Sequence, residues 1–136
     1  MDKRNHNQQN CLIFDENQSN YNLLKRMVQS FHLNPVKFER LETALKYLET
    51  EPANLVIIDT DCLRNTTPGE VTARIKGLKP QCVVMWVCAH KPGKGEGEEV
   101  KPDIILEKPF GIMLFQQVLT PYIFSQSIPG HKNSVN

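Results

Sequence analysis

Four ionisable residues lie at the ends of short apolar segments in three separate parts of the chain. Asp15 and Glu16 end the first such segment, Asp59 ends another, and Lys108 closely follows a third. If these segments are strands of a parallel sheet, the side chains meet at its carboxyl edge, where doubly wound folds bind their ligands. Three carboxylates in one cleft would repel one another. A hard cation with oxygen ligands would remove that repulsion.

This set of residues predicts phosphoryl-transfer chemistry. Mg²⁺ suits the site because it takes a few carboxylates, keeps several waters and screens an incoming phosphate. Asp59 would act as a carboxylate nucleophile and form an aspartyl-phosphate. Lys108 would contact the phosphoryl oxygens and balance the developing charge. Any one of these residues alone is more often a cap or a solvated loop residue, so the prediction depends on the combination.

Two alternating apolar patterns indicate the elements that must position these residues. Four short, continuous apolar segments are typical of strands buried on both faces; they are residues 11–14, 55–58, 82–88 and 104–106. Residues 36–38, VKF, are a weaker candidate for the second strand. Segments with apolar residues at helical spacing separate most of them. Strands that alternate with helices predict an α/β fold, with a doubly wound parallel sheet and helices on both of its faces.

Four helices are predicted, and capping signals indicate where two of them begin. Their apolar faces are Leu24, Met27, Val28 and Phe31; Leu41, Ala44, Leu45 and Leu48; Val71, Ile75 and Leu78; and Phe115, Val118, Leu119 and Tyr122. Ser19 is a candidate cap for the first helix, and Thr67-Pro68-Gly69-Glu70 has the pattern of a capping box. Residues 91–100 read KPGKGEGEEV, and each interior glycine costs roughly 1 kcal/mol against alanine in a helix. We therefore expect the fourth helix of the α/β pattern, between the last two strands, to be short or missing.

Composition restricts the class of protein. The 136 residues, 40% hydrophobic and 23% charged, suit one globular domain with a single core. A net charge of +1 gives no reason to expect a nucleic-acid or membrane-surface partner. No apolar run approaches the roughly 20 residues that cross a bilayer. The polar start MDKRNHNQQN lacks the pattern of a signal peptide, so we expect a cytoplasmic location.

The cysteines and histidines show no metal-binding pattern. Cys11, Cys62, Cys82 and Cys88 include no Cys-x-x-Cys pair, and the four histidines are scattered. We expect the cysteines to be structural thiols, without a metal or a disulfide. We also expect Trp86 to be a core residue, because its neighbours are apolar, and His90 to be a solvated loop residue.

Three segments resemble the motifs of the receiver domains of response regulators and hybrid sensor kinases. Residues 12–17, LIFDEN, match the acidic end of the family's first strand, and residues 54–59, NLVIID, match the strand that carries the phosphoacceptor. Residues 106–110, LEKPF, match its Lys-Pro ending. The resemblance implies a flavodoxin-like sheet of five parallel strands in the order 2-1-3-4-5.

The resemblance also implies a division of the chain. The receiver domain would cover residues 10–124, after a disordered segment 1–9 and before a polar tail or linker 125–136. The family is known for homodimers through the face made by the fourth helix, the fifth strand and the last helix, so this chain could pair in the same way. We expect no enzyme activity, no nucleic-acid partner of this domain and no membrane partner.

Roles follow from the resemblance one position at a time. Asp59 would receive the phosphoryl group from a histidine kinase or a histidine phosphotransfer protein. Asp15 and Glu16 would hold Mg²⁺ directly or through water, together with Asp59 and the backbone carbonyl of Asp61. Lys108 would contact the phosphate, and the X-Pro peptide bond that follows it would be cis.

Three positions depart from the family's pattern. Cys88 stands where the family has Thr or Ser, whose hydroxyl bonds the phosphoryl group, and a thiol is a weaker donor. Ile105 stands where an aromatic switch residue is usual, and Leu63 lies near the place of an expected proline. We expect phosphate acceptance to survive, while Cys88, Ile105 and the Gly-rich residues 91–97 weaken the conformational readout.

Two other functions fit parts of the pattern. A degenerate receiver would bind proteins without being phosphorylated; the changed switch positions favour it, and the retained acids and lysine oppose it. Phosphatases of the haloacid-dehalogenase type share the pattern Asp59-Thr60-Asp61 and a later Lys-Pro. They need further acidic metal ligands, however, and no Asp or Glu follows Glu107 in this chain. We therefore expect a signalling domain and not an enzyme.

Overall fold

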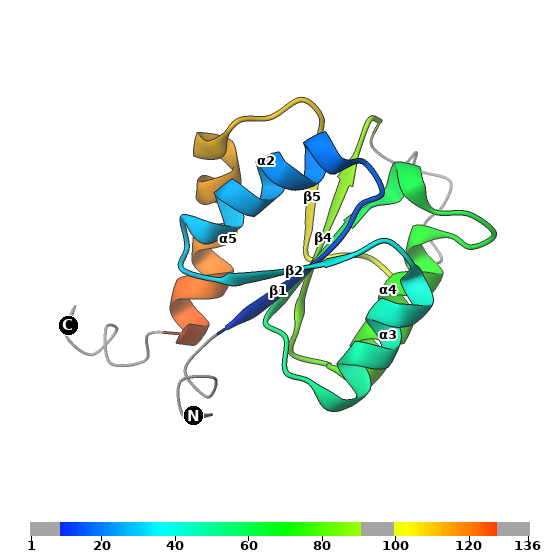
Figure 1. Ribbon diagram of the computed structural model, residues 1–136. Coiled ribbons are helices and arrows are strands. Elements are labelled where there is room, and N and C mark those ends of the chain that lie inside the picture. Colours follow the sequence, from blue (N-terminus) through cyan, green and yellow to red (C-terminus); the bar gives the residue numbers. More distant parts are fainter. Residues whose placement is uncertain (1–8, 91–99, 128–136) are drawn as a thin grey trace.

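A single parallel sheet of five strands crosses the centre of the protein in the order β2-β1-β3-β4-β5 (Figure 1). The structure is a computed structural model, and it describes residues 9–90 and 100–127. The strands are β1 (Asn10–Phe14), β2 (Asn34–Phe38), β3 (Leu55–Asp59), β4 (Val83–Cys88) and β5 (Ile104–Glu107). The predicted fold class and strand order are confirmed.

The burial of the strands explains their continuous apolar sequences. All residues of β3 and β4 are buried, because helices cover both faces of the sheet there. The edge strand β2 is less buried and begins at Asn34, two residues before the predicted start. It includes Pro35, which a strand at the sheet edge tolerates because one side of its backbone has no strand partner.

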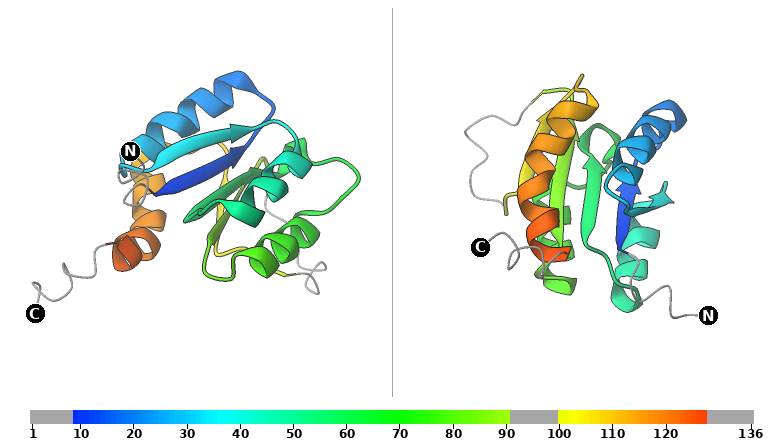
Figure 2. Two further views of the ribbon diagram at one scale, coloured as in Figure 1. Left: turned by 60° about the horizontal axis from the view of Figure 1, so that its bottom comes forward. Right: turned by 90° about the vertical axis from the view of Figure 1, so that its left-hand side faces the viewer.

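Helices cover the two faces of the sheet in pairs. They are α2 (Gln18–Gln29), α3 (Leu41–Thr50), α4 (Pro68–Leu78) and α5 (Ile112–Ser127), with a short 3₁₀ helix, η1 (Thr60–Cys62). Helices α2 and α5 pack on one face, and α3 and α4 pack on the other (Figure 2). Alternate strand residues supply the two cores: Ile13 faces α2 and α5, whereas Leu12 faces α3 and α4.

The helix starts test the predicted caps. Thr67 caps α4, because its hydroxyl oxygen accepts a hydrogen bond from the Glu70 backbone N–H at 3.1 Å, as predicted. The prediction that Ser19 caps α2 is wrong. Asn17 is the cap: its backbone is extended and its side-chain oxygen accepts from the Asn20 N–H at 2.9 Å. An Asn that directly precedes a helix serves this purpose as well as a Ser.

Most of the predicted core residues are buried. Trp86 is 5% exposed and its indole N–H donates to the Thr72 hydroxyl at 2.8 Å, which confirms it as a core residue. His90 is exposed, as predicted. Leu78 was expected to face the core but is 40% exposed in the last turn of α4.

Some predictions concern the loop between β4 and β5 and the C-terminal end of the domain. Residues 91–99, where a short or missing fourth helix was predicted, lie outside the described part of the chain, and the described residues beside them (89–90 and 100–103) are not helical. Helix α5 continues to Ser127. Among the described helices, none is long and apolar enough to cross a membrane.

Candidate functional site

Two buried carboxylates lie side by side at the carboxyl edge of the sheet. In the paired strands β1 and β3, Phe14 lies opposite Ile58. The next residue on each strand is therefore an acid, Asp15 or Asp59, and parallel pairing brings the two together. Asp15 is 0% exposed and Asp59 is 1% exposed. Charged groups are almost never buried so completely without a compensating partner, so this pair marks the site.

Lys108 compensates part of this charge. Its Nζ lies 3.0 Å from Asp59 Oδ2 and 3.0 Å from Asp61 Oδ2. Burial lowers the pKa of Lys108, but the hydrogen bonds to Asp61 and Asp59 outweigh it and leave the pKa raised, so the amine stays charged. The side chain reaches the acids from the end of β5, and the Lys108–Pro109 peptide bond is cis, as the resemblance implied.

Asp15 is a buried acid whose negative charge is poorly compensated. Its Oδ1 accepts from the Asn17 N–H at 2.9 Å, whereas Oδ2 is buried and has no hydrogen-bond partner among the described residues. Burial raises the pKa of Asp15 to about 6; the nearby Asp59 carboxylate raises it further, and the Asn17 hydrogen bond acts in the opposite direction. The site therefore holds a carboxylate that is costly to ionise unless a cation binds.

The helix η1 brings a thiol to the acids. Asp59 Oδ1 accepts from the Asp61 N–H at 3.0 Å and so caps this 3₁₀ turn. The turn returns Cys62 toward β1, where its Sγ lies 3.7 Å from Asp15 Oδ1. Burial raises the pKa of Cys62 to about 11, so the free thiol is protonated at neutral pH. We expected only a structural thiol here, because no pattern in the sequence indicates that this turn brings Cys62 back to the acids.

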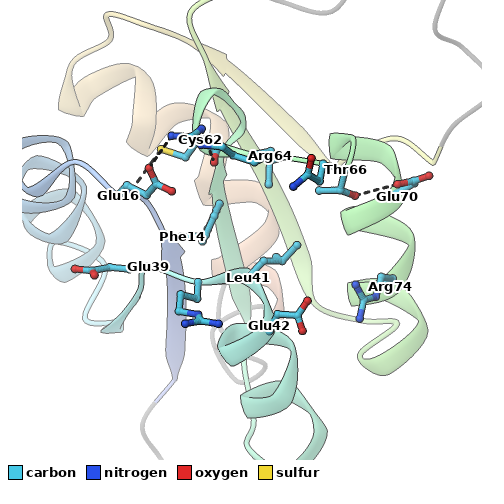
Figure 3. A pocket seen from close by; sticks show the side chains of 13 residues that line it. Phe14, Glu16, Glu39, Leu41, Glu42, Cys62, Arg64, Thr66, Glu70 and Arg74 are labelled. Carbon is cyan, nitrogen blue, oxygen red and sulfur yellow. Dashed lines mark hydrogen bonds and ion pairs between the residues drawn. The ribbon is translucent and has the colours of Figure 1, made fainter.

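Glu16 does not join the buried acids. Its side chain is exposed and its carboxylate pairs with Arg64 at 3.3 Å, at the rim of a cavity of about 650 Å³ (Figure 3). The described residues that bring metal-ligating atoms within 4.8 Å of one another are Asp15, Asp59 and Cys62. The backbone of Glu16 contacts this group, and its N–H donates to Cys62 Sγ at 3.5 Å.

The positions that depart from the receiver pattern lie beside the site. Cys88 is buried at the end of β4, and its Sγ is 3.9 Å from the Leu106 carbonyl oxygen, a weak hydrogen bond. Burial, and then the charge of Asp61, raise its pKa. Ile105 on β5 is partly buried against the core that α3 and α4 cover.

The donor set fits a hard divalent ion. Asp15 and Asp59 supply carboxylate oxygens, one of which is buried and has no partner in the described part of the chain, and such oxygens are the ligands that Mg²⁺ takes. A cavity of about 150 Å³ opens onto both acids and onto Lys108. Its walls are mainly apolar and include Leu23 of α2 and Phe110, which precedes α5.

Known structures share this architecture. The receiver domain of an HD domain-containing protein from Pseudomonas fluorescens Pf-5 is 17% identical, with a TM-score of 0.75 over 88% of this chain and 97% of that one. A CheY-like receiver domain from Methanospirillum hungatei JF-1 is 15% identical, with a TM-score of 0.74 over 88% of this chain and 96% of its own.

A third similar structure contains a metal. It is the receiver domain of a sensor histidine kinase from Pseudomonas aeruginosa PAO1, with a magnesium ion coordinated in its active site cleft; it is 18% identical, with a TM-score of 0.71 over 85% of this chain and 98% of that one. The sequence matches no protein-family model and no curated protein. The chain has the fold of CheY-like response regulator receiver domains.

Proposed function

We propose that this domain accepts a phosphoryl group on Asp59, with the help of Mg²⁺, from a histidine kinase or a histidine phosphotransfer protein. The observation that carries the proposal is the position of Asp59, buried at the end of β3 with Asp15 on one side and Lys108 on the other. Lys108 compensates the negative charge of this buried carboxylate at 3.0 Å, and a divalent ion bound beside it would add to that compensation.

Asp59, the backbone of Asp61 and Lys108 would have different roles in phosphoryl transfer. One carboxylate oxygen of Asp59 attacks phosphorus while the bond to the donor histidine nitrogen breaks, and that nitrogen keeps the bonding electrons. The Asp61 N–H holds Asp59 Oδ1 at 3.0 Å and fixes the orientation of the carboxylate. Lys108, 3.0 Å from Asp59 Oδ2, lies where it would contact the oxygens of the incoming group.

The magnesium ligands would come from the same residues. Asp15 and Asp59 would bind the ion directly, and the backbone carbonyl of Asp61 would complete the protein's share. Glu16 would act through water, because its carboxylate is paired with Arg64. When bound, Mg²⁺ supplies positive charge that offsets the carboxylates and the phosphoryl oxygens.

An apolar surface beside the cavity is suited to the phosphodonor. Leu23 of α2 is 50% exposed, and Ile112, Met113 and Leu114 at the start of α5 are 41%, 79% and 44% exposed. Leu23 also lines the cavity that reaches Asp59. Large apolar side chains that are exposed to solvent favour a protein partner over a small donor. We therefore place the docking site of the phosphodonor on α2 and the start of α5.

The second candidate is a protein-binding module that is not phosphorylated. It is favoured by Cys88, which offers only a buried thiol at the position where the receiver family has a hydroxyl. This change affects the response to phosphate more than its acceptance, because the nucleophile and the lysine are both present and in contact. Phosphorylation of Asp59 is therefore the property that separates the two candidates.

Intact mass spectrometry after incubation with acetyl phosphate and Mg²⁺ tests the proposal. We expect the wild type to gain one phosphoryl group, Asp59→Asn to gain none, and chelation of Mg²⁺ by EDTA to prevent the gain. Asp103→Asn is the matched control, because Asp103 pairs with Lys76 at the opposite end of the sheet, before β5. An unmodified wild type, or equal labelling of Asp59→Asn, would contradict the proposal and leave the binding module.

A further inference from the structure

Cys62 gives the acidic site a soft ligand that a magnesium centre does not use. One carboxylate oxygen each from Asp15 and Asp59 and the Sγ atom of Cys62 lie within 4.8 Å of one another. The distance from Cys62 Sγ to Asp15 Oδ1 is 3.7 Å. In a tetrahedral zinc site, bond lengths of about 2.0 Å to oxygen and 2.3 Å to sulfur place an oxygen ligand and a sulfur ligand about 3.5 Å apart. The observed separation is close to that value.

A second observation, on the other carboxylate oxygen of Asp15, also points to a ligand. Asp15 is 0% exposed, and its Oδ2 has no hydrogen-bond partner among the described residues. A buried carboxylate oxygen without a partner costs free energy that a metal ion would recover. Asp59 is equally buried, and only Cys62 of the three is partly exposed.

We propose that Asp15, Asp59 and Cys62 form a site for a thiophilic divalent ion, with Zn²⁺ as the best fit. Zinc accepts mixed oxygen and sulfur ligands, and water would complete its four-coordinate shell. Cys62 binds as the thiolate, so its proton passes to solvent when the metal–sulfur bond forms. The Glu16 N–H already donates to Cys62 Sγ at 3.5 Å, the kind of outer hydrogen bond that supports a metal-bound thiolate.

The metal has a route that does not use the phosphate cavity. Cys62 lines the cavity of about 650 Å³ between the loops that precede α3 and α4, and Figure 3 shows its sulfur beside Glu16 at the upper edge of this cavity. Asp15 and Asp59 line the other cavity, of about 150 Å³. The three ligands thus lie between two openings, and zinc would arrive from the side of Cys62.

Zinc at this site would inhibit phosphoryl acceptance. The ion would occupy an oxygen of Asp59 and would exclude Mg²⁺ from Asp15, because the two metals share both carboxylates. This consequence rests on the proposed phosphorylation of Asp59, whereas the zinc site itself does not. The chain would then combine two inputs at one place, a phosphodonor and a thiophilic metal.

Cobalt substitution tests the site directly. Co²⁺ is added to the reduced, metal-free full chain, and the near-ultraviolet charge-transfer band of a thiolate–cobalt bond is measured. We expect the band in the wild type and in Cys88→Ser, which removes the other thiol near the site, but not in Cys62→Ser. We also expect Cys62→Ser to bind Zn²⁺ at least roughly tenfold more weakly, by competition with a chromophoric chelator, with its Mg²⁺ affinity retained.

Further results distinguish a failure of the zinc site from a failure of the proposed function. Asp15→Asn should weaken both metals, which shows that the loss in Cys62→Ser is specific to the soft ion. A wild type without the band, or a Cys62→Ser variant that keeps it, overturns the zinc site. Phosphorylation in Mg²⁺ alone tests the proposed function separately: its absence alongside a Cys62-dependent band defeats that function and not the site. Phosphorylation that is unaffected by stoichiometric Zn²⁺ overturns the competition between the two metals.

Discussion

Replacement of Asp15 by Asn should stabilise the metal-free protein. Asp15 places a charge that is 0% exposed beside the carboxylate of Asp59, and one of its oxygens has no partner among the described residues. An Asn side chain keeps an oxygen that can accept from the Asn17 N–H, as Asp15 Oδ1 does at 2.9 Å. It also places an amide donor, instead of a second acceptor, near Asp59. The change therefore removes a repulsion without leaving a new polar atom unpaired.

The pKa of Asp15 gives the size of the effect. It rises from 3.8 to about 6, chiefly because the group is buried. A raised pKa means that the folded state holds this proton more tightly than the unfolded chain does. The contribution of Asp15 to the stability of the wild type is therefore greatest below pH 4 and is lost as the pH rises to about 6. At pH 7 the loss amounts to at most about 3 kcal/mol, since a tenfold change in proton affinity corresponds to about 1.4 kcal/mol.

Urea unfolding in EDTA, followed by the fluorescence of the single tryptophan, Trp86, measures this difference. We expect Asp15→Asn to exceed the wild type by up to about 3 kcal/mol at pH 7 and by much less at pH 4. Glu16→Gln is the matched control, because this neighbouring carboxylate is exposed and its pair with Arg64 is worth only about 0–1 kcal/mol. A variant that is less stable at pH 7, or a gain that is equal at both pH values, would refute the reasoning.

Four further predictions concern the nucleophile's surroundings, the docking surface, the core and the readout. Lys108→Ala should slow phosphorylation by acetyl phosphate on the order of a hundredfold, measured by the rate of the mass increase. Met113→Asp should lower transfer from a phosphorylated donor protein by roughly tenfold and leave the acetyl phosphate reaction unchanged; equal effects on both would argue against docking there. Thr72→Val should cost about 1–3 kcal/mol in urea unfolding, because the indole N–H of Trp86 loses its acceptor. Cys88→Thr should increase the change in amide exchange that a phosphate mimic causes across β4, β5 and α5, whereas a large change already present in the wild type would contradict a weakened readout.

The parts of the site that could be predicted from sequence are those that strand geometry determines. Asp15 and Asp59 each follow a buried apolar strand, and once β1 and β3 pair in parallel their positions follow from the register. Lys108 is predictable for the same reason, because it follows the short apolar strand β5. In these cases the local pattern determines the element, and the element determines where the side chain lies.

The parts that could not be predicted depend on partners distant in the sequence or on close local competition. The Glu16 carboxylate pairs with Arg64, which lies 48 residues away in the sequence. Asn17 and Ser19 are both good capping residues two positions apart, and only the backbone conformation selects Asn17. Cys62 reaches Asp15 because of a 3₁₀ turn that begins with a hydrogen bond to Asp59 itself. No periodicity in the sequence carries that information.

The geometry also separates the proposed acceptance of phosphate from its consequences. Asp59 and Lys108 are in direct contact, so nucleophile and counter-charge are in place before any ligand arrives. Cys88 instead makes a weak bond to the Leu106 carbonyl, and its thiol would be a weaker donor than a hydroxyl toward a new phosphoryl oxygen. A phosphoryl group on Asp59 would instead compete with Asp61 for Lys108, now 3.0 Å from both carboxylates. Asp61 also accepts a hydrogen bond from the Ala89 N–H and belongs to η1. The first structural response should therefore appear in the loop between β3 and α4.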